Sequence, residues 1–271
     1  MSWLGSATDS AARLRCLVPW AAMSGAAVLG AATLWATGSP ALERFVGPLP
    51  GPIVVASAGA AGLGALAFLE RRGFWRCCTR ATTIRGIGVA VAATLPFAVV
   101  AIGVDTAVGF PRDTNVAWPQ AWIVYPVIAV VAEAAFHLLP VSGLVWLTRS
   151  RFTDSGLDGP AIGLVLAAAA VEPAAQAALG SALLPFVVPH VLLIGVGQLL
   201  LLRYFGYVPM VAFRLSYYLA WHVLWGDARL RLLFWPQDPR VGPAMRREGR
   251  SPVLMVAELH LDPQRRSHGI C

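Results

Sequence analysis

The sequence predicts an all-α polytopic membrane protein, a bundle of about seven to eight transmembrane helices. Hydrophobic residues make up 57% of the 271 residues, charged residues only 13%, and the mean hydropathy is +0.66. An average soluble domain is about one-quarter charged, and a soluble globule of this length could not cover so much apolar surface. The same apolar content excludes a disordered chain. Apolar runs of about 20 residues, the length that crosses a bilayer as a helix, therefore place the chain in a membrane.

Seven apolar runs account for the expected helices. They are residues 17–36, 52–69, 86–104, 121–147, 160–180, 185–202 and 208–225. The first run is longer than the apolar core of a signal peptide, so we expect it to remain as a span. The fourth run is longer than one crossing requires, and Pro140 is expected to bend or break its helix just after His137.

These runs divide the chain into three parts. An N-terminal segment, 1–16, precedes a transmembrane domain, 17–226, and a polar, Arg-rich tail, 227–271, follows it. Within the tail, residues 251–262 partly alternate between apolar and polar, a pattern compatible with a strand.

The net charge of +7 is best explained as a topology signal. All 21 basic residues are Arg, and most lie at the ends of apolar runs or in the tail, which argues against nucleic-acid binding and for contact with lipid. Five of them fall within 70–85 and predict a cytoplasmic loop. Seven spans would then put the Arg-rich tail outside, so six or eight spans agree better with the charge rule. The Lys-free, Ala- and Gly-rich composition favours a bacterial inner membrane.

The four cysteines carry no recognisable pattern. Cys16, Cys77, Cys78 and Cys271 show neither metal-ligand nor disulfide spacing, and we expect reduced, structural thiols.

A few ionisable residues interrupt the apolar runs, and they predict the functional site. They are Glu133, His137, Glu172, His190, Arg214 and His222. Each costs about 2.5–3.5 kcal/mol on membrane-insertion scales, so we expect these side chains to face one another or a water-filled cavity. Glu133 and His137 are four residues apart and share one face of a helix.

The chemistry of this set leaves several alternatives open. A Glu with His residues from separate helices can activate a water molecule, with or without zinc. We expect no cofactor, although Glu and His could ligate zinc. The structural alternatives are a His that only hydrogen-bonds a neighbouring helix, a neutral Glu172 beside Pro173, and an Arg214 that reaches the interface or pairs with Glu172.

Three short motifs, in order, resemble the CPBP family of intramembrane proteases, which is related to the CAAX prenyl endopeptidase. The segment 133–137 (EAAFH) resembles the family's E-E-x-x-x-R motif, in which Phe usually precedes the Arg. Phe186 and His190 match F-x-x-x-H, and His222 partly matches H-x-x-x-N. The resemblance covers about residues 120–226. It implies that Glu133 is the general base, that His190 positions the attacking water, and that His222 stabilises the oxyanion. We expect His137, Phe186, Glu172 and Arg214 to support this site.

The chain also departs from the family pattern at three positions. Ala134 replaces the second Glu, His137 replaces the Arg, and Gly226 replaces the Asn that would help to stabilise an oxyanion. Losing one such donor costs about 10²–10³ in rate in well-studied hydrolases.

Three functions are compatible with these residues. The first is an intramembrane endopeptidase that hydrolyses a bond in a peptide or membrane-protein substrate with a water activated by Glu133 and His190. The second is a catalytically inactive family member that acts as a membrane scaffold or binding protein. The third is a proton-coupled transporter that uses Glu133, Glu172 and Arg214, although no inverted repeat is evident.

Overall fold

The computed structural model describes residues 6–111, 114–152, 159–178 and 183–234, without the side chains of 6–15, 44 and 231–234. The chain forms two compact units, Met1–Leu230 and Arg231–Cys271. The first unit holds every described helix except the last residues of the final one. The possible strand at 251–262 and most of the predicted tail lie outside the described residues.

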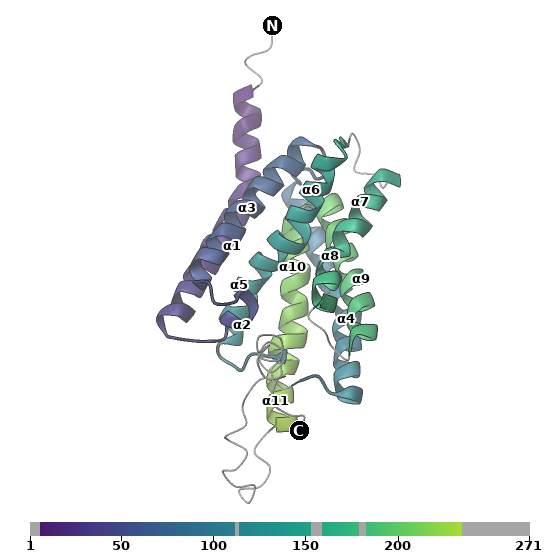
Figure 1. The fold of residues 1–271 in the computed structure, drawn as a ribbon. Helices are drawn as coiled ribbons and strands as arrows, with labels where there is room; N and C mark the ends of the chain where they lie inside the picture. The colour runs from purple at the N-terminus through teal and green to yellow at the C-terminus, as the bar shows by residue number, and fades with distance from the viewer. Residues whose placement is uncertain (1–5, 112–113, 153–158, 179–182, 235–271) are drawn as a thin grey trace, which may run out of the picture. The chain divides into compact units, whose positions relative to one another are not determined.

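Seven long helical segments make up the described part of the chain, as predicted from the seven apolar runs (Figure 1). In chain order the elements are α1 (Ser6–Ala36), a short α2 (Glu43–Val46), α3 (Gly51–Arg71), α4 (Arg80–Val108), α5 (Ala121–Ala132), η2 (Glu133–Leu138), α6 (Leu139–Leu147), α7 (Gly159–Ala169), α8 (Val171–Ala178), α9 (Leu184–Phe205), α10 (Tyr207–Tyr217), η3 (Tyr218–Trp225) and α11 (Gly226–Phe234). The elements α5, η2 and α6 follow one another without a break, and so do α10, η3 and α11.

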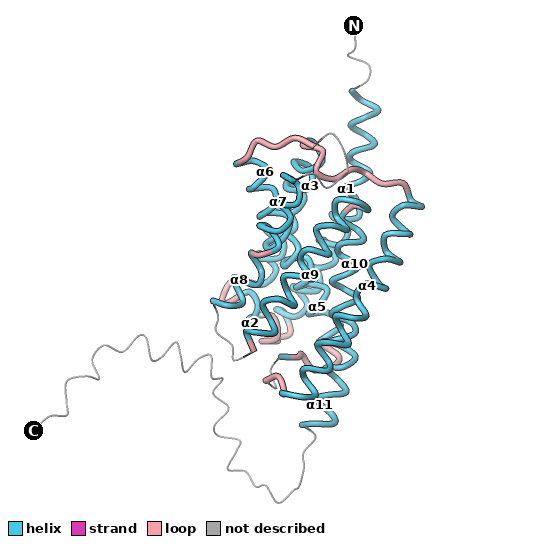
Figure 2. The backbone as a smooth tube through the Cα atoms, turned by 90° about the vertical axis from the view of Figure 1, so that its right-hand side faces the viewer, coloured by secondary structure: helices cyan, strands magenta, loops and turns pink. Residues whose placement is uncertain are grey.

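The protein is an all-α, multi-pass membrane protein. Six of the described helical segments are long and apolar enough to cross a membrane, and in Figure 2 the described elements are helices joined by short loops. The segment that begins with α10 is not among these six; it packs against α4, α9 and α5. Its first turns therefore lie within the bundle, which allows α10 to carry Arg214 away from lipid.

Close packing of the first two spans depends on small residues. The indole of Trp20 in α1 is fully buried and donates a hydrogen bond from Nε1 to the carbonyl of Gly59 in α3, at 2.8 Å. A Cβ atom on Gly62 would collide with the ring of Trp20, so only glycine leaves room for it. The helix α1 begins at Ser6, so part of the predicted N-terminal segment is helical.

Pro140 does not break the fourth span. The chain instead forms a π-helical turn, η2, from Glu133 to Leu138, and returns to an α-helix with Pro140 in its first turn. The disturbance was expected just after His137; it instead begins four residues earlier, at Glu133, as a wider turn of a continuous helix. A second π-helical segment, η3, lies in the last helix. π-Helical turns are rare in proteins, and those that occur often lie at functional sites. The turns η2 and η3 contain Glu133, His137 and His222.

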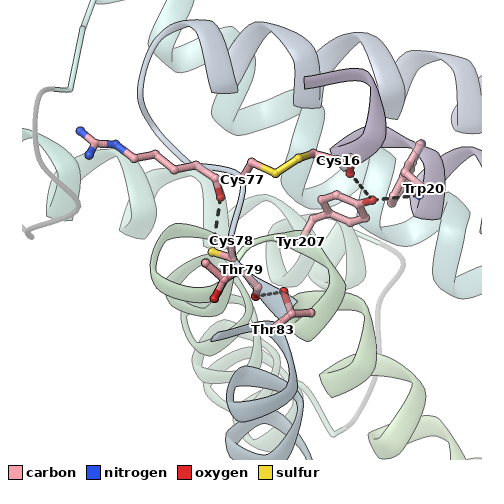
Figure 3. Close-up of a disulfide and its surroundings, with 8 residues drawn as sticks. Cys16, Trp20, Cys77, Cys78, Thr79, Thr83 and Tyr207 are labelled. Carbon is pink, nitrogen blue, oxygen red and sulfur yellow. Dashed lines mark hydrogen bonds between the residues drawn. A yellow bond between two sulfur atoms is a disulfide. The ribbon is translucent and has the colours of Figure 1, made fainter. Parts of the chain in front are cut away.

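The cysteine prediction is wrong for two of the four residues. Cys16 at the start of the first span and Cys77 in the loop after α3 form a disulfide, with Cα atoms 5.9 Å apart (Figure 3). The hydroxyl of Tyr207 beside it donates to the carbonyl of Cys16 at 2.8 Å and accepts the backbone N–H of Trp20 at 3.0 Å. The pairing spans 61 residues and depends on how α1 packs against α3, which cysteine spacing cannot reveal.

The neighbouring Cys78 carries a free thiol. Burial raises the pKa of this thiol. Burial therefore favours the protonated, less nucleophilic form of this thiol.

The disulfide lies in the same loop as several of the arginines that predicted a cytoplasmic location. Disulfides persist in oxidising compartments, whereas Arg-rich loops are typical of the cytoplasmic side. The charge rule and the disulfide therefore assign this end of the bundle to opposite sides of the membrane.

Candidate functional site

Five polar side chains from four helical segments meet inside the bundle and form what we call the charged core. They are Glu133 and His137 (η2), Glu172 (α8), Gln198 (α9) and Arg214 (α10). All five are buried, and Glu133, His137 and Gln198 have no exposed surface. The prediction that ionisable groups in the apolar runs face one another is confirmed for Glu133, His137, Glu172 and Arg214.

Arg214 is the centre of this arrangement. Its Nε donates to Glu133 Oε1 at 2.6 Å. Its Nη1 and Nη2 donate to the two oxygens of Glu172, at 3.1 and 2.7 Å. The planar guanidinium fits a carboxylate in this two-bond arrangement, which is stronger and more directional than a single contact. Of the alternatives left open by the sequence, pairing with Glu172 is correct, and Glu133 is a second partner.

Gln198 completes the contacts of Glu133. Its amide nitrogen donates to Glu133 Oε1, and its amide oxygen accepts from Arg214 Nη2 at 3.2 Å. Glu133 Oε1 therefore receives two N–H donors. Gln198 was not predicted because it is polar but not ionisable; its position within the apolar run 185–202 is the signal that could have revealed it.

His137 lies beside both charges. Its Nδ1 is 3.3 Å from Glu133 Oε2 and 3.4 Å from Arg214 Nη2. Within the described residues, Glu133 Oε2 and His137 Nε2 have no hydrogen-bond partner. Two carboxylates and one guanidinium sum to one negative charge, so the core is neutral only when it also holds one proton.

The two other predicted histidines lie in a different environment. His190 in α9 shares a hydrogen bond of 3.0 Å with the hydroxyl of Tyr217, and its ring lies 4.8 Å from that of Phe186 and 5.6 Å from that of Phe97. His222 in η3 donates from Nδ1 to Asn115 Oδ1 at 2.9 Å.

Ring packing joins these residues into what we call the aromatic cluster. Its members are Phe97, Asn115, Tyr125, Phe186, His190, Tyr217 and His222. The ring of His222 stacks on Tyr125 at 4.7 Å and lies edge-on to Tyr217 at 6.3 Å.

Tyr218 connects the two groups. Its hydroxyl accepts a hydrogen bond from Arg214 Nη1 at 3.0 Å, and its ring lies 5.2 Å from that of His222. The structure thus brings Glu133 together with Glu172 and Arg214, whereas the contacts described for His190 and His222 are with the aromatic cluster and its neighbours.

Asn115 is a residue that sequence reasoning missed. It lies in the loop after α4, and an amide side chain is common in loops and so gives no signal in the sequence. Its side chain packs against Gly226. A Cβ atom on Gly226 would lie 2.9 Å from Asn115 Cγ, so Asn115 occupies the space that a side chain at 226 would need. Its Nδ2 is buried and has no hydrogen-bond partner within the described residues.

A second buried ion pair was also missed. Asp105 in the last turn of α4 pairs with Arg229 in α11 at 2.7 Å and accepts the indole N–H of Trp225 at 2.7 Å. Asp105 was expected in a loop after the third apolar run, but the helix continues to Val108. The pair therefore ties the end of α4 to the start of α11.

Across residues 6–111, 114–152, 159–178 and 183–234, no group of three or more His, Cys, Asp or Glu side chains is placed to hold a metal ion.

Comparisons with family models, with curated proteins and with solved structures give no match to this chain.

Proposed function

We propose that this chain is a non-hydrolytic, multi-pass protein that binds or scaffolds other membrane components, an inactive relative of the CPBP proteases whose motifs it resembles. The observation that carries the proposal is the 2.6 Å ion pair between Glu133 and Arg214. A general base needs a free lone pair and a water within hydrogen-bond reach. Here the Glu133 carboxylate is fully buried, and its charge is paired with that of Arg214. Oε1 accepts from Arg214 and Gln198, whereas Oε2, which has no hydrogen-bond partner among the described residues, lies 3.3 Å from His137 Nδ1.

The geometry supports a structural role for the charged core. Replacing a buried ion pair by apolar residues is often neutral for stability, but removing one partner is strongly destabilising. The contacts of Arg214 link η2, α8 and α9 to α10, and they are satisfied in one arrangement of those helices. The core would thereby hold the bundle in one binding-competent shape, in a bacterial cell membrane as the composition suggests.

A proteolysis assay tests this proposal. Membranes from cells that express the wild-type chain, Glu133→Gln or Glu43→Gln would be compared by mass spectrometry for released peptides. Glu43 is an exposed carboxylate in α2 and serves as the matched control. We expect the same peptides in all three samples. Peptides that appear with wild type and Glu43→Gln but not with Glu133→Gln would overturn the proposal.

A second candidate is an intramembrane endopeptidase, and one observation favours it. The Asn115 amide beside Gly226 hydrogen-bonds His222 and keeps a buried, unpartnered Nδ2 within the described part of the chain. Asn115 would then supply, from another segment, the amide that Gly226 cannot. In this case Asn115→Ala should reduce peptide release by about 10²–10³-fold, as the loss of one oxyanion donor does. Equal release by wild type and Asn115→Ala would remove the candidate.

A further inference from the structure

Three arginines surround a cavity of about 570 Å³ at the end of the bundle where α3 and α6 finish. The cavity is lined by Arg72, Trp146, Leu147, Arg149 and Arg151. Arg72 follows the last residue of the span Gly51–Arg71, and Trp146 and Leu147 are the last two residues of the span Ala121–Leu147. The cavity therefore lies at the boundary between the apolar spans and the polar loops.

The lining has two chemically distinct parts. Trp146 and Leu147 are 64% and 67% exposed, on a helix end that faces the surrounding lipid. The three guanidiniums lie just beyond them in the sequence, at the level where phospholipid headgroups are found. Among the described residues none of the three forms an ion pair, and Arg72 instead lies over the ring of Phe68, with its Cζ 5.2 Å from the centroid.

Backbone contacts join the two chain segments that carry these arginines. The N–H of Phe152 donates to the carbonyl of Arg72 at 2.9 Å. Gly73 has a φ of +75°, and a Cβ atom there would collide with the carbonyl oxygen of Phe152. This close approach fixes the segment that carries Arg149 and Arg151 beside the end of α3.

Arg203 connects the same two chain segments a second time. Its Cζ lies 4.9 Å from the ring centroid of Phe152 and 5.4 Å from that of Phe74, and its Nη1 donates to the carbonyl of Phe74 at 3.1 Å. The two chain segments that bear the arginines are therefore packed on a common buried cation.

Arg149 adopts a conformation that is unfavourable for its residue type. Its φ is +53°, in the left-handed region, and it follows Thr148, the C-cap of α6. This position after a helix usually holds Gly or Asn, because a Cβ atom is strained there. An arginine is unusual at this position, and its side chain lines the cavity.

We infer that this cavity binds the phosphate headgroup of an anionic phospholipid, with the acyl chains lying along Trp146 and Leu147. Three guanidiniums can hold the phosphate oxygens by paired, charge-assisted hydrogen bonds. Basic pockets between transmembrane helices are a known form of anionic-lipid site. A soluble phosphate would satisfy the arginines but would leave the exposed apolar part of the lining unused.

Native mass spectrometry of the full chain in detergent tests the inference. The protein would be titrated with phosphatidylglycerol or with zwitterionic phosphatidylcholine, and the lipid-bound fraction measured. The wild type should retain phosphatidylglycerol in preference to phosphatidylcholine. Each guanidinium removed should weaken that binding by about fivefold, so Arg72→Gln with Arg151→Gln should weaken it by about 25-fold.

A matched variant separates a specific site from general charge. Arg80→Gln with Arg85→Gln removes two exposed arginines near the start of α4 and should leave lipid binding within about twofold of wild type. Equal weakening by both double variants, or none by either, would overturn the inference.

Two further measurements exclude misfolding and a different ligand. Arg149→Gly relieves the left-handed strain while removing one guanidinium, so it should keep the thermal stability of the lipid-free protein and still lose about fivefold in lipid binding. Thermal stabilisation should appear with phosphatidylglycerol and be absent with inorganic phosphate at the same concentration. Equal stabilisation by inorganic phosphate would show that the ligand is a free anion and would also overturn the inference.

Discussion

The charged core and the aromatic cluster satisfy buried polar groups in different ways. In the charged core, Arg214 holds Glu133 and Glu172 through ion pairs of 2.6 and 2.7 Å. In the aromatic cluster, His190 and His222 are held by hydrogen bonds to Tyr217 and Asn115 and by ring contacts. A carboxylate or guanidinium inside a membrane requires an opposite charge, whereas an imidazole can remain neutral with ordinary hydrogen bonds.

Because of this contrast, the stability of the charged core depends on each of its charged side chains, whereas that of the aromatic cluster does not. A buried charge left without its partner carries the whole cost of desolvation, whereas a neutral ring that loses a hydrogen bond keeps its packing. The expected effects of substitution therefore fall in order from the charged core to the edge of the aromatic cluster.

The largest effect is expected for Arg214→Met. This change leaves two carboxylates buried without a cation and should lower the free energy of unfolding by about 3–5 kcal/mol, or prevent folding. Adding Glu133→Gln and Glu172→Gln to the same chain should recover most of that loss, because no net charge then remains. Thermal and denaturant unfolding in detergent measure the stability of Arg214→Met and of the triple variant. A triple variant as unstable as Arg214→Met would show that the charges are not the cause.

A smaller effect is expected where the aromatic cluster meets the last helix. Gly226→Ala places a Cβ atom 2.9 Å from Asn115 Cγ and should cost about 1–3 kcal/mol, as overpacking does. The control is Gly103→Ala in α4, where a Cβ atom would meet nothing within 4 Å. This helical position should lose no stability and gain up to about 1 kcal/mol.

A compensating change makes that test more specific. Asn115→Gly should recover part of the stability lost in Gly226→Ala, because it empties the same space but also removes the hydrogen bond to His222. Unfolding measurements that show no difference between Gly226→Ala and Gly103→Ala would mean that Asn115 does not occupy this position.

The smallest effect is expected for His190→Phe. The substitution keeps an aromatic ring among Phe186 and Phe97 and removes only the hydrogen bond to Tyr217, so it should cost about 0.5–1.5 kcal/mol. The double variant with Tyr217→Phe should be closer to wild type than the sum of the single variants, since no buried hydroxyl is left unpaired. If His190→Phe lowered the free energy of unfolding as much as Arg214→Met does, His190 would belong with the charged core, and the contrast between the two regions would be wrong.

Much of the site was predictable because ionisable residues are costly in apolar runs. Glu133, His137, Glu172 and Arg214 were all found in this way, and the structure brings them together. Gln198 and Asn115 were missed because a neutral amide costs less and gives a weaker signal. His190 and His222 were found in the same way, but their described contacts are with the aromatic cluster. Their catalytic roles, which the family resemblance implies, stay a prediction.

The amino-acid sequence was enough to establish the class of protein and the approximate bounds of its helices, because hydrophobic length and interruption by Gly, Pro and Arg are local properties of the chain. The choice of partner for each polar group, in contrast, came from tertiary packing alone. The contacts of Arg214 with Glu133 and Glu172, of Asn115 with His222, and of Cys16 with Cys77 join residues that are 42 to 107 positions apart. Such pairings depend on how whole helices pack against one another, and no local pattern in the chain encodes that packing.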